Sequence, residues 1–401
     1  MSGLDRFADR LAVPPRVRRL RRGATLTLVF ASVLVTGAAT GSWSDTADDG
    51  RNPPPAATRP GAVAPLGGEA GTAEEAADAA AEAMADGKSA KDAAEKAVSR
   101  SGDRWGSVYS HGEYRKFEQA LDGAYTGVGL WARRGADGRI EVSRVQEGGP
   151  AERAGIREGD GLRAVDGERV TGRPVTEVVA LLRGDRAGTP VRLGLTRGTR
   201  AWSETLRRAR LSTDSVTVTE LSDGAVMIKV AAFTKGSGEA VRTAVREAPE
   251  GAGILLDLRG NSGGLVSEAV TASSALVDGG LVATYDVRGE QRALHAERGG
   301  DAHRPVVALV DGGTMSAAEL LTGALQDRGR AVVVGSRTFG KGSVQMPSRL
   351  PDGSVAELTV GHYRTPSGRA VDGRGITPDL EVERGAKERA EAVLTGLGPP
   401  S

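Results

Sequence analysis

The sequence predicts an α/β protein in which a smaller, strand-rich unit precedes a largely parallel sheet. Three observations predict this class. First, short apolar runs alternate with helical segments after residue 211. Second, these runs are apolar throughout, as in strands that are buried on both faces. Third, short strands with frequent turn signals fill residues 126–208. The expected strands of the sheet are Val226–Val230, Ile254–Leu258, Val306–Val310 and Ala331–Val334, and the expected helices between them are Gly238–Glu247, Val266–Leu276 and Ser316–Gln326.

Composition excludes several kinds of site. The 401-residue chain has no cysteine, which excludes thiol nucleophiles, disulfides and thiolate metal sites. Its net charge of +1 offers no electrostatic basis for binding nucleic acid. The histidines lack the short spacing of a helical metal site; they are His111, His295, His303 and His362. We therefore expect no metal, no cofactor and no nucleic-acid partner.

The first 44 residues have the order of a secretory segment. Residues 1–23 carry seven arginines and form a basic stretch, and residues 24–44 carry no charge. Spanning a membrane takes about 20 mostly apolar residues, so a cleaved signal peptide and a membrane anchor both remain open, while the flanking arginines disfavour a buried core helix. The positive-inside rule keeps the arginines cytoplasmic. We expect a cell-membrane protein whose remaining chain lies outside the cytoplasm, or a secreted one if the segment is cleaved.

The next two regions are a linker and a helical segment. Residues 45–71 are rich in proline, alanine and glycine, which is typical of a flexible linker. Residues 72–125 contain mainly helix-forming residues, with Gly87 as a break between two helices and a further helix from Glu113 to Ala124. Because alanine supplies most of their apolar surface, these helices need a partner, either the body of the chain or a second copy in a homo-oligomer.

Residues 126–208 resemble a PDZ domain. The resemblance rests on the loop Gly127-Val128-Gly129-Leu130, the segment Gly149–Ile156, and Gly159-Asp160 followed by Ala164–Gly167. A glycine-rich loop before an edge strand can direct backbone N–H groups at a terminal carboxylate while the strand adds the peptide to the sheet. Taken alone, Gly127 and Gly129 are also compatible with an ordinary turn, although this alternative is the less favoured one. The resemblance implies that the unit binds the C-termini of proteins or peptides.

A glycine-rich loop follows the second expected strand of the sheet. In open α/β sheets, ligands bind beyond the carboxyl ends of the strands. The loop Arg259–Gly264 exposes backbone N–H groups there, a geometry suited to an oxyanion, and we expect the amides of Gly263 and Ala317 to be the two donors. From this segment alone, a phosphate site or a plain turn remains an alternative.

Ser316 and Lys341 are the candidate reactive pair. Ser316 follows a glycine pair at the start of an expected helix, where Glu319 also favours a simple capping role. A serine hydroxyl needs a base to become a nucleophile. Lys341 lies in a glycine-framed segment, and burial would lower its pKa from about 10.4 toward neutrality. Gln345, four residues on, can orient the amine, although a surface loop lysine is the alternative.

A Ser-His-Asp triad is the competing chemistry. His362 lies on an expected strand, and we expect it to serve packing or to face solvent. The sequence gives it no glycine-framed pocket.

Together these segments resemble the C-terminal processing, or tail-specific, peptidases over about residues 100–383. Further matching segments are Gly323–Asp327, Tyr363–Gly368 and Gly375–Asp379, whereas Asp311, Thr314 and Met315 replace residues that are common in the family. The resemblance implies a crotonase/Clp-protease-like α/β catalytic core at residues 209–385 with an inserted PDZ domain, and a C-terminal tail at 386–401. It also implies that Ser316 is the nucleophile, Lys341 the general base and Gln345 its orienting partner.

The expected function is that of an extracytoplasmic serine endopeptidase that cleaves or degrades proteins from their C-terminal region. Two alternatives belong to other classes. A non-catalytic PDZ adaptor on a decayed peptidase core would bind peptides without turnover. A carrier of small apolar ligands would bind its ligand tightly and would not react with a serine-directed covalent probe.

Overall fold

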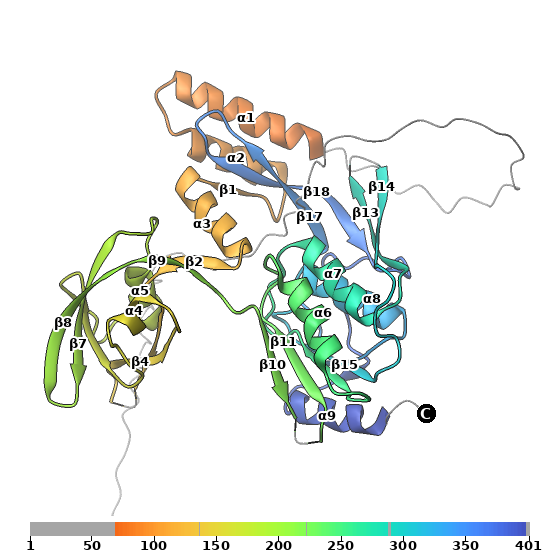
Figure 1. The fold of residues 1–401 in the computed structure, drawn as a ribbon. Coiled ribbons are helices and arrows are strands. Elements are labelled where there is room, and N and C mark those ends of the chain that lie inside the picture. The colour runs from red at the N-terminus through yellow and green to blue at the C-terminus, as the bar shows by residue number, and fades with distance from the viewer. Residues whose placement is uncertain (1–68, 136, 222, 288–289, 398–401) are drawn as a thin grey trace, which may run out of the picture.

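The computed structural model describes residues 69–135, 137–221, 223–287 and 290–397 (Figure 1). The predicted basic stretch, the signal or anchor segment and nearly all of the linker lie outside these residues. No helix in the described ranges has the length and apolar character needed to cross a membrane.

A central sheet of six strands forms the core, and its strands are largely parallel as predicted. Within this sheet, β11, β12, β15, β16 and β19 run parallel to one another, and only β10 is antiparallel to its neighbour. The expected strands correspond to β11, β12, β15 and β16, each within one residue of its predicted bounds. In spatial order the strands are β10 (Val216–Glu220), β11 (Val226–Val230), β12 (Ile254–Asp257), β15 (Val306–Val310), β16 (Val332–Gly335) and β19 (Leu380–Glu381).

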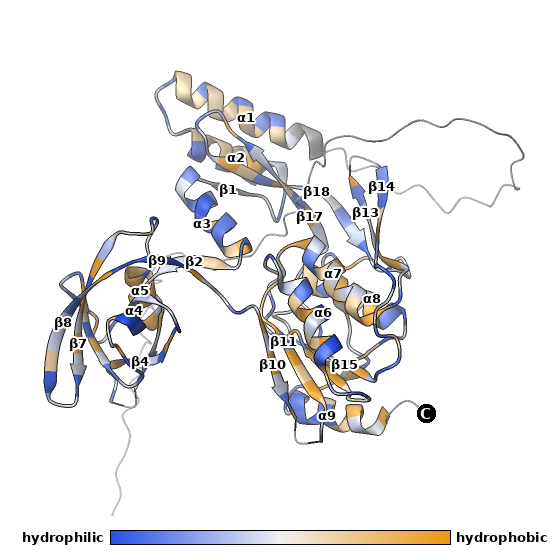
Figure 2. Ribbon diagram, viewed as in Figure 1, coloured by the Kyte–Doolittle hydropathy of each residue, from blue (hydrophilic) through white to orange (hydrophobic). Residues whose placement is uncertain are grey.

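Helices cover both faces of this sheet, which explains the continuous apolar runs. On β12, Ile254 and Leu256 pack into the larger cluster beneath α6 (Ser237–Glu247), α7 (Val266–Leu276) and α8 (Ala317–Asp327). Leu255 points the other way and packs against α9 (Ala386–Leu397). The segment expected as a C-terminal tail is therefore helical to Leu397, because the far face of the sheet needs a cover. Figure 2 shows hydrophobic residues gathered in the central strands.

A second sheet stands beside the core and carries the N-terminal helices. Its order is β1-β18-β13-β14, and β17 also pairs with β18. α1 and α2 lie against the β17–β18 hairpin (Figure 1). They bury alanines such as Ala80 and Ala94 against Leu350 and Leu358 of that hairpin. The partner of these helices is thus the body of the chain, and self-association through them stays a prediction. The elements are α1 (Glu69–Ala85), α2 (Ala90–Ser101), β1 (Ser107–Tyr109), α3 (His111–Leu121), β13 (Leu281–Val287), β14 (Glu290–His295), β17 (Ser343–Arg349) and β18 (Val355–Arg364).

The strand-rich unit is inserted through a two-stranded neck. The chain enters along β2 (Ala124–Gly127) and returns along β9 (Ala209–Ser212), and these strands pair antiparallel. Between them lies a separate core that includes Val191, Leu193 and Leu195, the residues of the predicted alternating strand. The sheet order is β3-β4-β5-β7-β8 with β6 on β5; the elements are β3 (Leu130–Arg134), β4 (Ile140–Val145), α4 (Pro150–Arg153), β5 (Gly161–Val165), β6 (Glu168–Arg169), α5 (Val175–Leu182), β7 (Pro190–Arg197) and β8 (Arg200–Arg207).

Candidate active site

Ser316 lies in a strained turn between β15 and α8. Its backbone has φ +56° and ψ −117°, a conformation that residues with a side chain rarely adopt. For this reason α8 begins at Ala317, one residue later than predicted. Strain of this kind costs about 1–3 kcal/mol and persists only where the surroundings enforce it. The turn fixes a buried serine, 1% exposed, directly in front of a helix.

The Glu319 carboxylate holds the backbones of Ser316 and Lys341 together. Its Oε2 accepts the amide hydrogens of both residues, each at an N···O distance of 2.9 Å. Its Oε1 accepts hydrogen bonds from Thr338 Oγ1 at 2.5 Å and from the Gly340 amide at 2.7 Å. Burial raises the pKa of this carboxyl group, and the four donors oppose that rise. The predicted cap of α8 is therefore also the clamp between the two candidate reactive segments.

Tyr363 provides a second link between the same segments. Its hydroxyl lies 3.0 Å from the carbonyl oxygen of Ser316 and 3.3 Å from that of Lys341, so it donates between them. The side chain is 3% exposed and belongs to β18. Ser316 and Lys341 are thus joined through their amides by Glu319 and through their carbonyls by Tyr363.

Lys341 is fully buried, in contrast to the surface lysine of the alternative interpretation. Its Nζ donates to Gln345 Oε1 at 2.8 Å. Burial lowers the pKa of Lys341 to about 8, and the nearby carboxylates of Glu357, Asp103 and Asp372 only partly counteract this effect. An amine with such a pKa is substantially neutral at mildly alkaline pH and can accept a proton.

Trp105 completes the surroundings of Lys341, and sequence reasoning missed it. The lysine Nζ lies 5.4 Å from the centre of the indole ring, and the Trp105 carbonyl accepts a hydrogen bond from Gln345 Nε2. The indole N–H donates to Asp372 at 3.2 Å. Trp105 precedes β1, far from Lys341 in the sequence, and no local spacing connects the two. Only the pairing of β1 with β18 brings them together.

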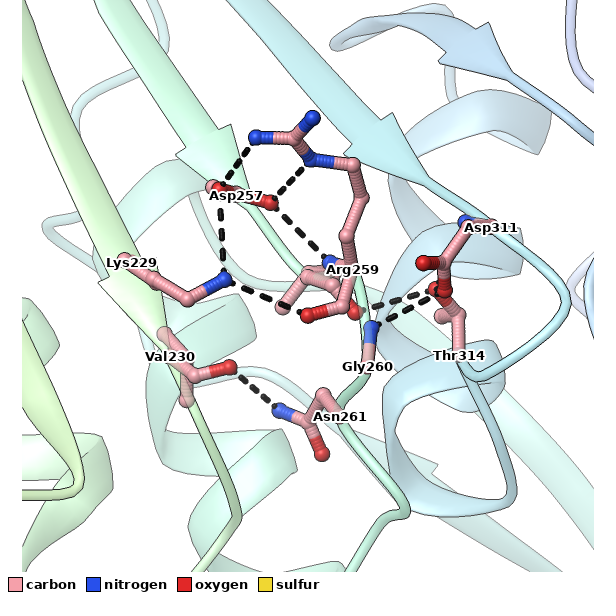
Figure 3. Close-up of polar contacts among 9 residues, drawn as sticks. Lys229, Val230, Asp257, Arg259, Gly260, Asn261, Asp311 and Thr314 are labelled. Carbon is pink, nitrogen blue, oxygen red and sulfur yellow. Dashed lines mark hydrogen bonds and ion pairs between the residues drawn. The ribbon is translucent and has the colours of Figure 1, made fainter. Parts of the chain in front are cut away.

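The glycine-rich loop after β12 is anchored by a buried carboxylate (Figure 3). Asp257 accepts two hydrogen bonds from the guanidinium of Arg259, both at 2.9 Å, and one from Lys229 at 3.3 Å. Burial alone would raise the pKa of Asp257, but Arg259 and Lys229 hold it below its ordinary value. The charged carboxylate therefore fixes the point at which the loop leaves the strand.

Asp311 and Thr314, two of the departures from the family pattern, tie this loop to the Ser316 turn. Asp311 Oδ1 accepts the amide hydrogens of Gly260 and Gly313, each at 2.9 Å. Thr314 Oγ1 donates to the Leu258 carbonyl at 2.9 Å. As Figure 3 shows, both side chains bridge from the strand end before Ser316 to the neighbouring loop. Asp311 and Thr314 thus hold the loop and the Ser316 turn together through hydrogen bonds.

The two expected oxyanion donors lie beside Ser316, but they differ in their present partners. A Cβ added to Gly263 would come within 2.9 Å of Ser316 Cβ and 3.3 Å of the Ala317 nitrogen, so only glycine leaves this space open. Among the described residues, nothing accepts the Ala317 amide hydrogen. The Gly263 amide instead donates to Asn261 Oδ1 at 2.9 Å, because asparagine readily bonds the amide two residues ahead in a turn. Asn261 is the second residue that sequence reasoning missed.

His362 lies on β18 and faces solvent, which is one of the two roles expected for it. Its side chain is 47% exposed, and its Nε2 is 3.9 Å from Asp372 Oδ2. Lys341 is buried and His362 is exposed. Of the two candidate bases, only the lysine is therefore shielded from solvent.

The Gly127–Leu130 loop of the strand-rich unit leads from the neck into β3, the end strand of its sheet. Its carbonyl groups are bound, since Val128 O accepts from Ala151 and Gly129 O from Gln146. The amide hydrogens of Val128 and Gly129 have no acceptor within the described ranges. α5 packs beside β3. The loop therefore presents two backbone donors at the start of an edge strand.

Replacing Glu319 with glutamine tests the clamp. The amide has a single acceptor atom and would direct an NH₂ group at backbone donors, so we expect a loss of unfolding free energy of about 3 kcal/mol. Glu113→Gln is the matched control, because Glu113 occupies the same capping position on α3 but is exposed, and it should cost less than about 1 kcal/mol. Urea denaturation measures both values. Equal effects of the two changes would refute the clamp.

Comparisons with known proteins identify both units. Residues 225–382 match peptidase family S41, and residues 141–197 match the PDZ domain family. The carboxy-terminal processing protease CtpA of Bacillus subtilis (strain 168) is 33% identical over 299 residues, covering 73% of this chain and 64% of the relative. The chloroplastic carboxyl-terminal-processing peptidase 3 of Arabidopsis thaliana is 33% identical over 308 residues, covering 72% and 59%.

A solved structure, the photosystem II D1 C-terminal processing protease, is 30% identical and covers 73% of this chain and 82% of its own, with a TM-score of 0.48. The alignments span somewhat less than two thirds of the length of these curated relatives. The sequence matches nevertheless agree on one family and on its accessory domain. The chain is a member of peptidase family S41 that carries a PDZ domain.

Proposed function

We propose that this chain is a serine endopeptidase that cleaves proteins near their C-termini with Ser316 as nucleophile and Lys341 as general base. The observation that carries the proposal is the buried Lys341 amine, which is oriented by Gln345 at 2.8 Å and clamped through Glu319 to the backbone of Ser316. The names of the curated relatives support the same reaction.

In the proposed reaction, Ser316 Oγ attacks the scissile carbonyl carbon while its proton passes to Lys341 Nζ. The negative charge that develops on the carbonyl oxygen is stabilised by the Ala317 amide and by the Gly263 amide, once the latter exchanges Asn261 Oδ1 for the substrate oxygen. Lys341 then returns the proton to the leaving amine, which gives an acyl-enzyme and a free amine. Water hydrolyses the ester by the same steps, and Ser316 regains its proton.

Removal of either reactive group tests the dyad. Ser316→Ala and Lys341→Ala should each reduce cleavage of a C-terminally tagged protein by at least about 10³-fold while the fold is retained. Ser343→Ala is the matched control, because Ser343 is also buried near Lys341 and its hydroxyl has no hydrogen-bond partner in the described chain. Cleavage is followed by gel electrophoresis and folding by circular dichroism.

A serine-directed covalent probe gives an independent readout of Ser316. Wild-type protein and Ser343→Ala should be labelled, and Ser316→Ala should not. Peptide binding without labelling or turnover in the wild type would favour the adaptor, and tight binding of a small apolar ligand without labelling would favour the carrier. Persistent cleavage in either dyad variant would refute the mechanism.

The pH dependence of catalysis follows from the state of the lysine. Lys341 must be neutral to accept the serine proton, and burial lowers its pKa to about 8. We therefore expect kcat/KM to rise about tenfold per pH unit below that value and to level off above it. A lysine with an unperturbed pKa would instead make kcat/KM rise up to about pH 10.4. A rate that falls as pH rises through 8 would contradict a lysine base.

We further propose that the PDZ unit binds the free C-terminus of the substrate. The unbonded amides of Val128 and Gly129 would bind the terminal carboxylate, with Gly127 and Leu130 framing the loop. The peptide would extend along the free edge of β3 beside α5, where backbone hydrogen bonds supply affinity and side-chain pockets supply specificity.

Amidation of the substrate C-terminus tests this role. A peptide with an apolar, free C-terminus should bind Ser316→Ala protein at least about tenfold more tightly than the same peptide ending in an amide, because the amide lacks the charge that the loop would bind. Fluorescence anisotropy measures both affinities. Equal affinities would exclude carboxylate recognition by the loop.

We also propose that residues 24–44 direct the peptidase across or into the cell membrane, with residues 1–23 on the cytoplasmic side. The proposal is supported by the uncharged composition of this segment and by the arginines that precede it.

A further inference from the structure

Glu357 is a buried acid that the proposed mechanism does not use. It lies on β18, opposite Ser107 of β1 and Pro347 of β17. Its side chain is fully buried, and neither carboxyl oxygen has a hydrogen-bond partner in the described part of the chain. Burying a carboxyl group without donors is costly, so a native protein that does so calls for a physical explanation.

The sheet register places Glu357 on the side of the hairpin that carries the lysine partner Gln345. Thr359 lies opposite Gln345, and Glu357 is two residues from Thr359 on the same strand, so all three side chains share one face. Lys341 Nζ is bonded to Gln345, and the charges of Lys341 and Glu357 influence each other directly. The acid and the candidate base therefore occupy one buried site.

The other ionisable groups of this site are two tyrosines and two aspartates from other parts of the chain. The charge of Glu357 acts on Tyr109 of β1 and on Tyr114 of α3. Burial, assisted by that charge, raises the pKa of each phenol to about 12. Both phenols thus stay neutral. Asp103 and Asp372 are the other carboxylates that act on Lys341.

Asp103 and Asp372 differ from Glu357 in having donors of their own. Asp103 accepts hydrogen bonds from the Gly106 amide at 2.9 Å and from Thr359 Oγ1 at 2.7 Å, and Asp372 accepts from the Gly342 amide at 3.0 Å. Lys341 is the only opposite charge that acts on Glu357 among the described residues. The carboxylate and the ammonium are therefore each other's main electrostatic partner.

We propose that Glu357 is the buried counter-ion of Lys341 and controls how readily the lysine releases its proton. This inference rests on the proposed role of Lys341 as the general base. An ionised Glu357 favours the ammonium form of Lys341, which cannot accept the serine proton. Glu357 thus acts through Lys341 and not on the substrate: burial lowers the pKa of the lysine, and the charge of Glu357 opposes that decrease.

Burial moves the pKa values of the two groups toward each other, because it disfavours the charged form of each. Burial raises the pKa of Glu357 to about 7, and burial lowers that of Lys341 to about 8. Whenever Glu357 is ionised, its negative charge favours the protonated form of Lys341. Removing that charge must therefore shift lysine deprotonation to lower pH.

Glu357→Gln, an uncharged replacement of nearly the same shape, tests the pairing without relying on catalysis. In a Ser316→Ala background, the side-chain NMR signal of Lys341, assigned by its loss in Lys341→Ala, is titrated with and without the change. We expect the Lys341 pKa to fall by about one pH unit when Glu357 is replaced. Glu118→Gln, which removes an exposed charge near Tyr114, should leave it unchanged. An unchanged Lys341 pKa in Glu357→Gln would overturn the inference.

The pH profile of cleavage by the otherwise unaltered enzyme provides the second readout. Glu357→Gln should shift the acidic limb of kcat/KM downward by the same amount, so the variant outperforms wild type at mildly acidic pH. A shifted NMR titration with an unshifted limb would support the counter-ion pair but contradict Lys341 as the base. If Glu357→Gln fails to fold, Glu357→Met removes the same charge with an apolar side chain of similar volume, and the same outcomes apply.

Discussion

The Glu319 carboxylate is the interaction on which the candidate active site depends. Ser316 and Lys341 lie on two segments that are well separated in the sequence. A single oxygen of Glu319 holds these segments together, because it accepts the amide hydrogens of both residues. Only an ionised carboxylate accepts four donors at once, and its burial is tolerated because each donor is itself a buried group that needs an acceptor. The strained backbone of Ser316 persists for the same reason, since the carboxylate fixes the turn from within.

Burial of Lys341 makes the N-terminal region part of the site. An amine in water would keep its proton at neutral pH, so the candidate base works only where solvent is excluded. Trp105 provides one wall, and its carbonyl orients Gln345, which in turn binds the amine. α1 and α2 hold this wall in place by packing on the same hairpin that carries Gln345. The helices that looked marginal from their alanine content therefore support the lysine's surroundings.

The sequence predicted what short-range patterns determine. β15 and α7 match their predicted bounds, because a strand buried on both faces and a helix beside it leave clear apolar patterns. Ser316 was placed inside α8 because its positive φ comes from long-range hydrogen bonds that no local pattern records. The sequence did not predict the roles of Trp105 and Glu357 for a related reason. Only the register of β1, β17 and β18 brings these two residues close to Lys341. Sequence spacing therefore locates reactive residues more readily than the groups that control their protonation.

The Gly263 amide shows how the resting geometry could favour the transition state. It is bonded to Asn261 Oδ1, whose own amide group is held by the Val230 carbonyl at 2.9 Å. Under the proposed mechanism, a neutral substrate carbonyl competes with another neutral amide oxygen and gains little from the exchange. A negatively charged oxyanion gains more, because hydrogen bonds to charged acceptors are about twice as strong. The exchange thus stabilises the transition state more than the bound substrate, and such a difference is what raises the rate of the chemical step.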